Sequence, residues 1–143
     1  MDGINRLLFF TLRESRYALT LRNVAEVMEP PQIYPIPHAP HFFPGIMNFH
    51  GNLVSVLDLA LFLSGAPRNS QGKILVLDTR IANLSIWVDT IESIGSTDAI
   101  LEEYASDENL VEKLLMMADG EVKMLSVERL LDKLEDILAA AGV

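Results

Sequence analysis

Apolar residues in this chain come in short runs separated by polar turn residues, the pattern of a protein built mainly from β-strands. The first run, at residues 7–12, is closed by four polar residues and resumes at 17–21, which predicts a β-hairpin. Residues 22–29 carry apolar side chains at helical spacing and predict one or two turns of helix. The two prolines at positions 30 and 31 end that helix.

A second hairpin is predicted in the middle of the chain, with strands over residues 45–49 and 53–59. The two strands are joined at His50, Gly51 and Asn52, and the last two belong to the residue types that tolerate a positive φ, so the chain can reverse there. Prolines cannot donate to a sheet ladder, and two of them come just before this hairpin. We therefore expect its first strand to begin at Gly45.

After the central hairpin, the sequence predicts a short helix, a loop and two strands in that order. Asp58 is expected to cap a short helix over residues 59–63. Residues 66–72 are the most loop-like part of the chain and the first candidate for mobility. The nearly continuous apolar run at 73–77 predicts a strand buried on both faces, and the alternation over 81–94 predicts one long strand.

The last third of the chain predicts a solvated connection, a hairpin and a helix. Residues 95–109 are polar and acidic, whereas 111–117 and 122–125 are apolar runs that flank an Asp-Gly turn signal. Ser126 can cap a C-terminal helix. One face of that helix carries an apolar stripe: Val127, Leu130, Leu131, Leu134, Ile137, Leu138 and Ala141. Many short strands with one substantial helix predict closed or nearly closed β-barrels.

Composition narrows the class of protein. At 143 residues and 50% hydrophobic content the chain fits one domain over residues 1–143, or two small lobes that share a core. The absence of cysteine excludes disulfides and thiol chemistry. A net charge of −9 argues against nucleic acid or an anionic membrane as a partner. We see no signal peptide and no segment long enough to enter a bilayer, and expect a cytoplasmic protein.

The residues offer little catalytic chemistry. Three histidines, His38, His41 and His50, fall within one short region that Asp58 follows, so a divalent metal site is conceivable. Their spacing matches no familiar ligand motif, and the chain has no Gly-x-Ser-x-Gly elbow. We therefore expect no cofactor, no metal and no enzymatic activity. A small metal-dependent enzyme that uses these histidines is the rival hypothesis.

Four stretches, taken in order, resemble one family. They are FFTLRESRYALTLRNVAEVM at residues 9–28, PHFFPGIMNFHG at 40–51, VSVLDL at 54–59 and LSVERLL at 125–131. In this order and spacing the chain resembles the CheW family of chemotaxis coupling proteins. The family pattern for the second and third stretches is Gly-Val-x-Asn-Leu-Arg-Gly and Val-Pro-Val-Ile-Asp-Leu. This sequence departs from it at Phe49, His50 and Ser55.

The resemblance implies a mainly β fold of two small SH3-like β-barrels that share a core, with a C-terminal α-helix and no catalysis. It implies an adaptor between the cytoplasmic tip of a chemoreceptor and the regulatory domain of a chemotaxis-type histidine kinase. A CheW-like module of another kinase pathway, in surface motility or gene regulation, is the nearer alternative. The family's partner-contacting surface falls on Val24, Glu26, Val27, Gly45, His50 and Gly51, although Val24 and Val27 also suit packing and both glycines also suit backbone geometry.

Overall fold

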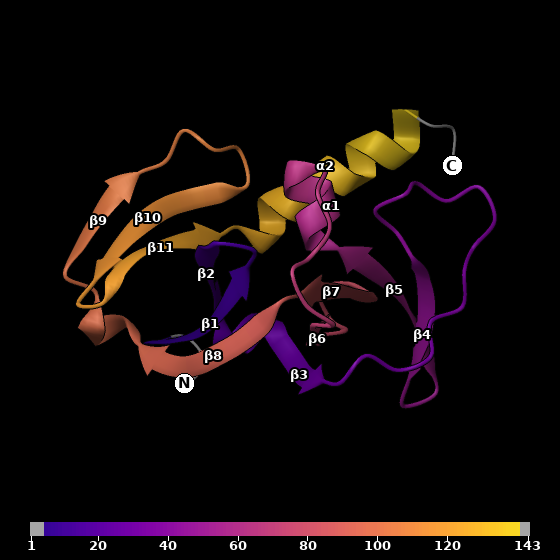
Figure 1. Cartoon of the computed structure of the whole chain (residues 1–143), viewed down its shortest axis with the longest axis horizontal. Coiled ribbons are helices and arrows are strands. Elements are labelled where there is room, and N and C mark those ends of the chain that lie inside the picture. The colour runs from indigo at the N-terminus through magenta and orange to yellow at the C-terminus, as the bar shows by residue number, and fades with distance from the viewer. Residues whose placement is uncertain (1–4, 141–143) are drawn as a thin grey trace.

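The computed structural model describes residues 5–140 and contains two β-sheets and two α-helices (Figure 1). One sheet has six strands in the order β8-β1-β2-β11-β10-β9, and the other has five in the order β3-β6-β7-β5-β4. The six-stranded sheet consists of β1 (Arg6–Leu12), β2 (Ser15–Thr20), β8 (Thr90–Ser96), β9 (Glu102–Ala105), β10 (Val111–Met117) and β11 (Gly120–Leu125). The five-stranded sheet consists of β3 (Val24–Met28), β4 (Gly45–Phe49), β5 (Asn52–Asp58), β6 (Lys73–Leu77) and β7 (Leu84–Val88).

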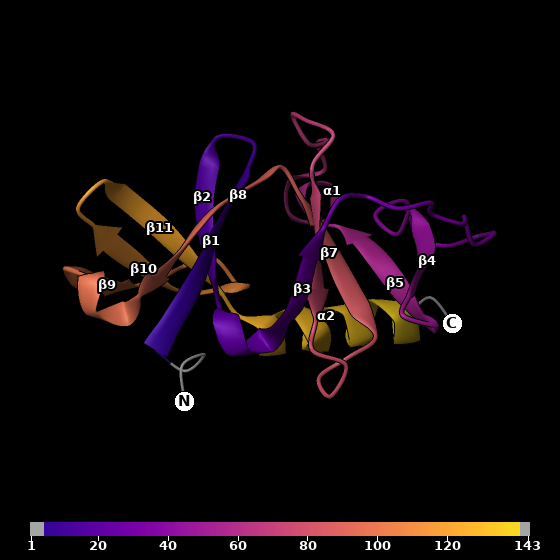
Figure 2. The same cartoon turned by 90° about the horizontal axis from the view of Figure 1, so that it is seen from below.

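The helical elements join and cover these sheets. They are α1 (Leu59–Ser64), α2 (Val127–Ala140) and the 3₁₀ turns η2 (Leu21–Asn23) and η3 (Thr97–Ala99). Figure 2 shows α2 beginning beside the six-stranded sheet and running across the five-stranded one. Two sheets with one C-terminal helix confirm the predicted fold class. Each sheet is an open series of strands rather than a fully closed barrel.

A single hydrophobic core joins the two halves of the molecule. Its members include Phe10 of β1, Leu57 of β5, Ile86 of β7 and Leu130 of α2, none of which is measurably exposed to solvent. Two smaller clusters fill the individual sheets. Since burial of apolar side chains is the main force that holds such layers together, the two halves are expected to fold as one unit.

Several local predictions are confirmed. The Asp58 side chain accepts a hydrogen bond from the Leu61 amide and caps α1, and Ser126 Oγ accepts one from the Arg129 amide at the start of α2. Strand β4 begins at Gly45, as the preceding prolines suggested. On the predicted α2 stripe, Val127, Leu130 and Leu134 are buried. Its last member, Ala141, lies outside the described residues.

The predicted turn of the central hairpin, His50-Gly51-Asn52, was one residue too long. Positive φ values occur at His50 (50°) and Gly51 (87°), whereas Asn52 already belongs to β5 and pairs with Phe49. The connection therefore has two residues, and hairpin turns of this length favour positive φ at both.

The predicted helix over residues 22–29 was also wrong. The segment forms η2 and then strand β3, which pairs antiparallel with β6 through Val24 opposite Leu77 and Val27 opposite Leu75. β-Branched valines favour a strand, and pairing with a buried strand outweighs a helical spacing that extends over only two turns.

The single long strand predicted for residues 81–94 is two strands in different sheets. Strand β7 ends at Val88, and β8 begins at Thr90. Between them lies the buried Asp89, whose carboxylate accepts hydrogen bonds from the Arg13 and Ser70 amides at 2.6 and 2.9 Å. The solvated connection predicted for 95–109 likewise contains η3 and the exposed edge strand β9.

Candidate functional site

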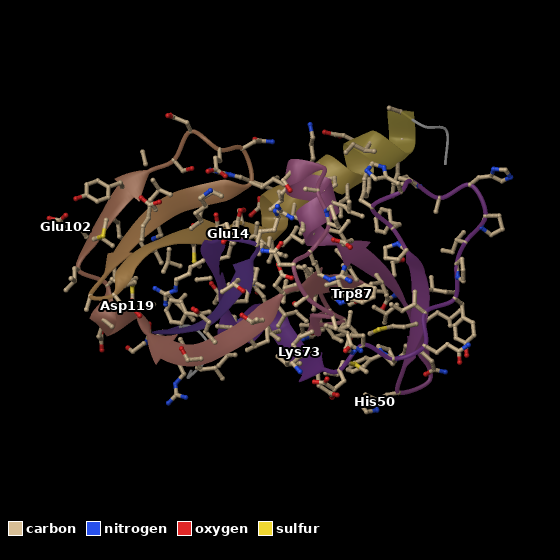
Figure 3. All side chains as sticks on the ribbon, viewed as in Figure 1. Glu14, His50, Lys73, Trp87, Glu102 and Asp119 are labelled. Carbon is tan, nitrogen blue, oxygen red and sulfur yellow. The ribbon has the colours of Figure 1, made fainter. Side chains whose placement is uncertain are left out.

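The site expected from the sequence lies on the five-stranded sheet, where edge strand β3 meets the tip of the β4–β5 hairpin. His50 Nε2 and Glu26 Oε1 are 3.2 Å apart, although β3 and β4 are opposite edges of this sheet. The two side chains are 71% and 44% exposed, so both are accessible to a partner. Figure 3 shows His50 at the tip of the hairpin. The sheet must curl to bring its two edges together at this pair.

Within residues 5–140, strand β3 is paired on one side only, so it presents an accessible edge. It bonds to β6, and Ala25, Glu26 and Val27 are all exposed. Val27 is 39% exposed, a large value for an apolar residue within a strand. Val24 is half-buried and packs against the shared core. The structure therefore leaves Val27 available for contact and gives Val24 a packing role.

The two glycines of the expected site have different surroundings. Gly45 is buried, and a Cβ atom there would lie 2.2 Å from the Tyr34 carbonyl oxygen. Tyr34 bonds through its backbone to Ile46 at 2.8 and 2.9 Å, so Gly45 lets the chain before β4 pack against that strand. A Cβ atom at Gly51 would meet open space, with nothing within 4 Å, and this glycine serves the turn, where its φ is 87°. The geometry favours backbone roles for both residues.

Sequence reasoning missed three exposed apolar side chains around this surface. Leu53 next to the hairpin tip is 65% exposed, Tyr34 is 50% exposed, and Ile94 of β8 is 52% exposed. Strand β8, which carries Ile94, and strand β3, which carries Val27, lie on either side of the region where the two sheets face one another (Figure 2). For Leu53 a signal was present, because it alternates with the buried Val54 along β5.

The rival hypothesis of a metal-dependent enzyme requires His38, His41 and His50 to converge with Asp58. Within residues 5–140, no group of three or more His, Asp or Glu side chains is placed to hold a metal ion. The Asp58 carboxylate is already engaged, because one oxygen caps α1 and the other pairs with Arg68. His50 pairs with Glu26 at the hairpin tip.

A separate groove of about 860 Å³ opens between α1, α2 and the β1–β2 turn. It is lined mainly by apolar residues, including Phe42, Phe62 and Ile137. Its Ser64 hydroxyl donates to the Ala60 carbonyl within α1. This bond lies within α1, whose C-cap is Gly65, and it gives the serine a local backbone partner.

Comparison with known proteins identifies the family of this chain. The sequence model of the CheW-like domain matches residues 6–135, which include every residue of the expected site. The chain belongs to the CheW-like domain family. No helix within the described residues is long and apolar enough to cross a membrane.

Individual relatives of this CheW-like chain are distant in sequence. It is 24% identical to the protein named Chemotaxis protein CheW of Helicobacter pylori over 139 residues, which cover 92% of this chain and 84% of that protein. It is 28% identical to a protein of the same name from Thermotoga maritima over 86 residues, which cover 59% of this chain and 57% of that protein.

A solved structure supports the fold. The scaffolding protein TtCheW of Thermoanaerobacter tengcongensis superposes with a TM-score of 0.74 at 22% identity, covering 86% of this chain and 89% of that chain. At this level of identity the likeness establishes the architecture alone, and the partners must be argued from the surface.

Proposed function

We propose that this CheW-like protein is a non-catalytic adaptor in chemotaxis-type signalling. It couples the cytoplasmic tip of a chemoreceptor to the regulatory domain of a histidine kinase, and it acts in the cytoplasm, where both regions lie. Membership of the CheW-like family and relatives named as chemotaxis and scaffolding proteins support this role. The observation that carries it is the exposed Glu26–His50 pair, which lies beside the accessible edge of β3.

The surface around this pair suits a folded protein partner such as the kinase regulatory domain. It combines the Glu26–His50 hydrogen-bonding pair with the exposed apolar Leu53 and with a strand that is an edge of its sheet within residues 5–140. Protein interfaces commonly have such an apolar contact surrounded by polar groups, and the polar groups determine orientation and the choice of partner.

We assign the binding site of the receptor tip to the region where the two sheets face one another. Val27 and Ile94 contribute exposed apolar surface there, one from each sheet. A helical partner buries an apolar stripe against such a surface. Val27 and Glu26 are consecutive in β3 and therefore lie on opposite faces of the sheet, so the two partners would bind on either side of this strand.

A module of another kinase pathway is the alternative, and His50 is the residue that favours it. Arginine has a permanently charged planar group with five donors, whereas histidine is shorter and makes fewer hydrogen bonds. With His50 at the position where the family pattern has arginine, this adaptor is suited to a partner whose own contact residues differ.

A charge reversal at Glu26 tests the kinase surface. Glu26→Lys places a cation beside His50 and should weaken binding of the kinase regulatory domain about tenfold or more. The free energy of unfolding should change by only about 0.5 kcal/mol or less, since the side chain is 44% exposed. Isothermal titration calorimetry and thermal melting measure the two quantities.

Glu121→Lys is the matched control, because Glu121 is an exposed glutamate on β11 of the other sheet. It makes the same change in net charge and should leave kinase binding unaltered. Equal affinities for the two variants would show that binding responds to net charge alone. That result would count against a kinase contact at Glu26.

A further inference from the structure

The loop between α1 and β6, here called the strap (residues 66–72), is bonded to the opposite half of the molecule. The Arg13 Nη1 atom donates to the Pro67 carbonyl at 2.6 Å, and the Asn69 Nδ2 atom donates to Glu14 Oε1 at 3.1 Å. Arg13 and Glu14 form the β1–β2 turn of the six-stranded sheet, whereas the strap belongs by chain connection to the five-stranded sheet. These bonds therefore cross between the two halves.

The strap is also seated on the point where the chain passes from one sheet to the other. That point is Asp89, which is 5% exposed and lies between β7 and β8. The Ser70 amide and hydroxyl both donate to Asp89 Oδ1 at 2.9 Å, and the hydroxyl also lies 3.0 Å from the Asp89 carbonyl. The other carboxylate oxygen accepts from the Arg13 amide. One buried carboxylate thus holds the strap and the β1–β2 turn together.

On its own side the strap is held by a stacked arginine. The Arg68 guanidinium lies 3.7 Å from the ring centroid of Trp87 and pairs with Asp58, and only 14% of the Arg68 side chain is exposed. Trp87 Nε1 donates to the Gln71 carbonyl at 2.9 Å. Figure 3 labels Trp87 and Glu14, the residues that mark the two sides the strap connects.

Gly72 completes this attachment at the end of the strap. A Cβ atom there would lie 2.3 Å from the Val88 carbonyl oxygen, so only glycine permits the close approach to β7. Composition predicted that this loop would be mobile. Its side-chain bonds to both halves argue against that expectation.

We propose that the strap fixes the angle between the two sheets, and that Asn69 and Ser70 act as positioning residues for the adaptor. The shared core keeps the sheets together, but apolar contacts have little directional preference. Hydrogen bonds weaken steeply when their geometry is distorted, so those of the strap define one orientation. The effect on partner binding rests on the proposed function. The proposed receptor surface combines Val27 and Ile94 from different sheets, so the shape of that surface depends on the angle between the sheets.

The geometric part is tested without any partner. The natural chain has no cysteine, so Thr79→Cys in the β6–β7 turn and Glu121→Cys on β11 add one spin label to each half. Pulsed electron paramagnetic resonance should give one narrow distance distribution for the labelled parent. Asn69→Ala with Ser70→Ala removes the bond to Glu14 and the hydroxyl bonds to Asp89, and should broaden the distribution or add a second distance.

Ser106→Ala with Asn109→Ala is the matched control, since it makes the same change in composition within a loop of the six-stranded half. This control should keep the parent distribution. An unchanged distribution in the strap variant, at parent-like helix and strand content by circular dichroism, overturns the proposal. Broadening in both variants overturns it too, because general loosening would then account for the effect.

The functional part is tested by the affinity of the kinase regulatory domain, measured with and without a saturating receptor-tip fragment. Allosteric coupling typically changes the affinity for one ligand by about five-fold or more when the other is bound. We expect the kinase affinities of the parent, measured with and without the receptor-tip fragment, to differ by a ratio in that range. The strap variant should bind the kinase domain alone with an affinity within about two-fold of the parent, because that contact lies on one sheet. Its ratio of kinase affinities with and without the receptor-tip fragment should fall toward one. A ratio that stays at the parent value overturns the coupling role. A parent that binds neither partner contradicts the proposed function instead, and the distance measurement still decides the geometry.

Discussion

Replacement of Leu134 by alanine tests whether α2 is docked on the core that both sheets share. Leu134 is 5% exposed and belongs to that core cluster. Truncation of a buried leucine to alanine costs about 2–5 kcal/mol, because transfer energy is lost and a cavity remains. Domains typically have only about 5–15 kcal/mol of stability. At about 3 °C per kcal/mol for a chain of this length, the melting temperature should fall by roughly 6–15 °C.

The measurement is thermal and urea unfolding followed by circular dichroism. Glu135→Ala, one residue further on the outward face of α2, is the control and should stay within about 0.5 kcal/mol of the parent. Leu138→Ala should cost less than Leu134→Ala, about 1 kcal/mol, because Leu138 is only half-buried. The loss should appear in a single transition, since the core belongs to both sheets. Parent-like melting of Leu134→Ala, or two separate transitions, would refute the docked helix and the shared core.

Three further predictions concern single residues. His50→Arg should preserve the fold and tighten binding to an acidic partner, because a guanidinium is permanently charged and offers more donors than an imidazole. Calorimetry on the parent and the variant measures this, and identical affinities would reduce His50 to a turn residue. Gly45→Ala should destabilise the fold by about 1–3 kcal/mol, since its Cβ would collide with the Tyr34 carbonyl oxygen; a parent-like urea midpoint would contradict that contact. Hydrogen bonds from the Arg80 side chain lower the pKa of Asp78 to about 2. The ionised Asp78 carboxylate therefore stabilises the fold above pH ~4, which is near the pKa of aspartate in an unfolded chain. This stabilisation is lost as pH falls through about 2. Carboxyl NMR should show the Asp78 midpoint returning toward its normal value in Arg80→Ala, and an unmoved midpoint would remove Arg80 as the cause.

Local patterns in the sequence predicted the elements that depend on near neighbours. The buried strand at residues 73–77, the central hairpin and the helix caps at Asp58 and Ser126 are of this kind. Strand β3 was missed because its valines fit both a helical and an extended spacing over so short a segment. Its partner β6 lies about 50 residues further along the chain, so the deciding interaction is not local.

Contacts between distant residues also explain what was missed at the site and at the strap. The resemblance to the family located Glu26 and His50, but their 3.2 Å contact exists only because the sheet brings its two edges together. The break between β7 and β8 depends on Asp89, whose partners Arg13 and Ser70 come from two other loops. The composition of residues 66–72 suggested mobility for the same reason, since the partners of a loop side chain are not visible in its own sequence.

We propose that one adaptor molecule holds a receptor tip and a kinase regulatory domain at the same time. Size-exclusion chromatography with multi-angle light scattering tests it most directly, with the purified chain, the kinase regulatory domain and a receptor-tip fragment mixed singly and together. We expect a complex with each partner alone and a larger complex that contains all three proteins. Failure to bind either partner, or displacement of one partner by the other, would contradict it.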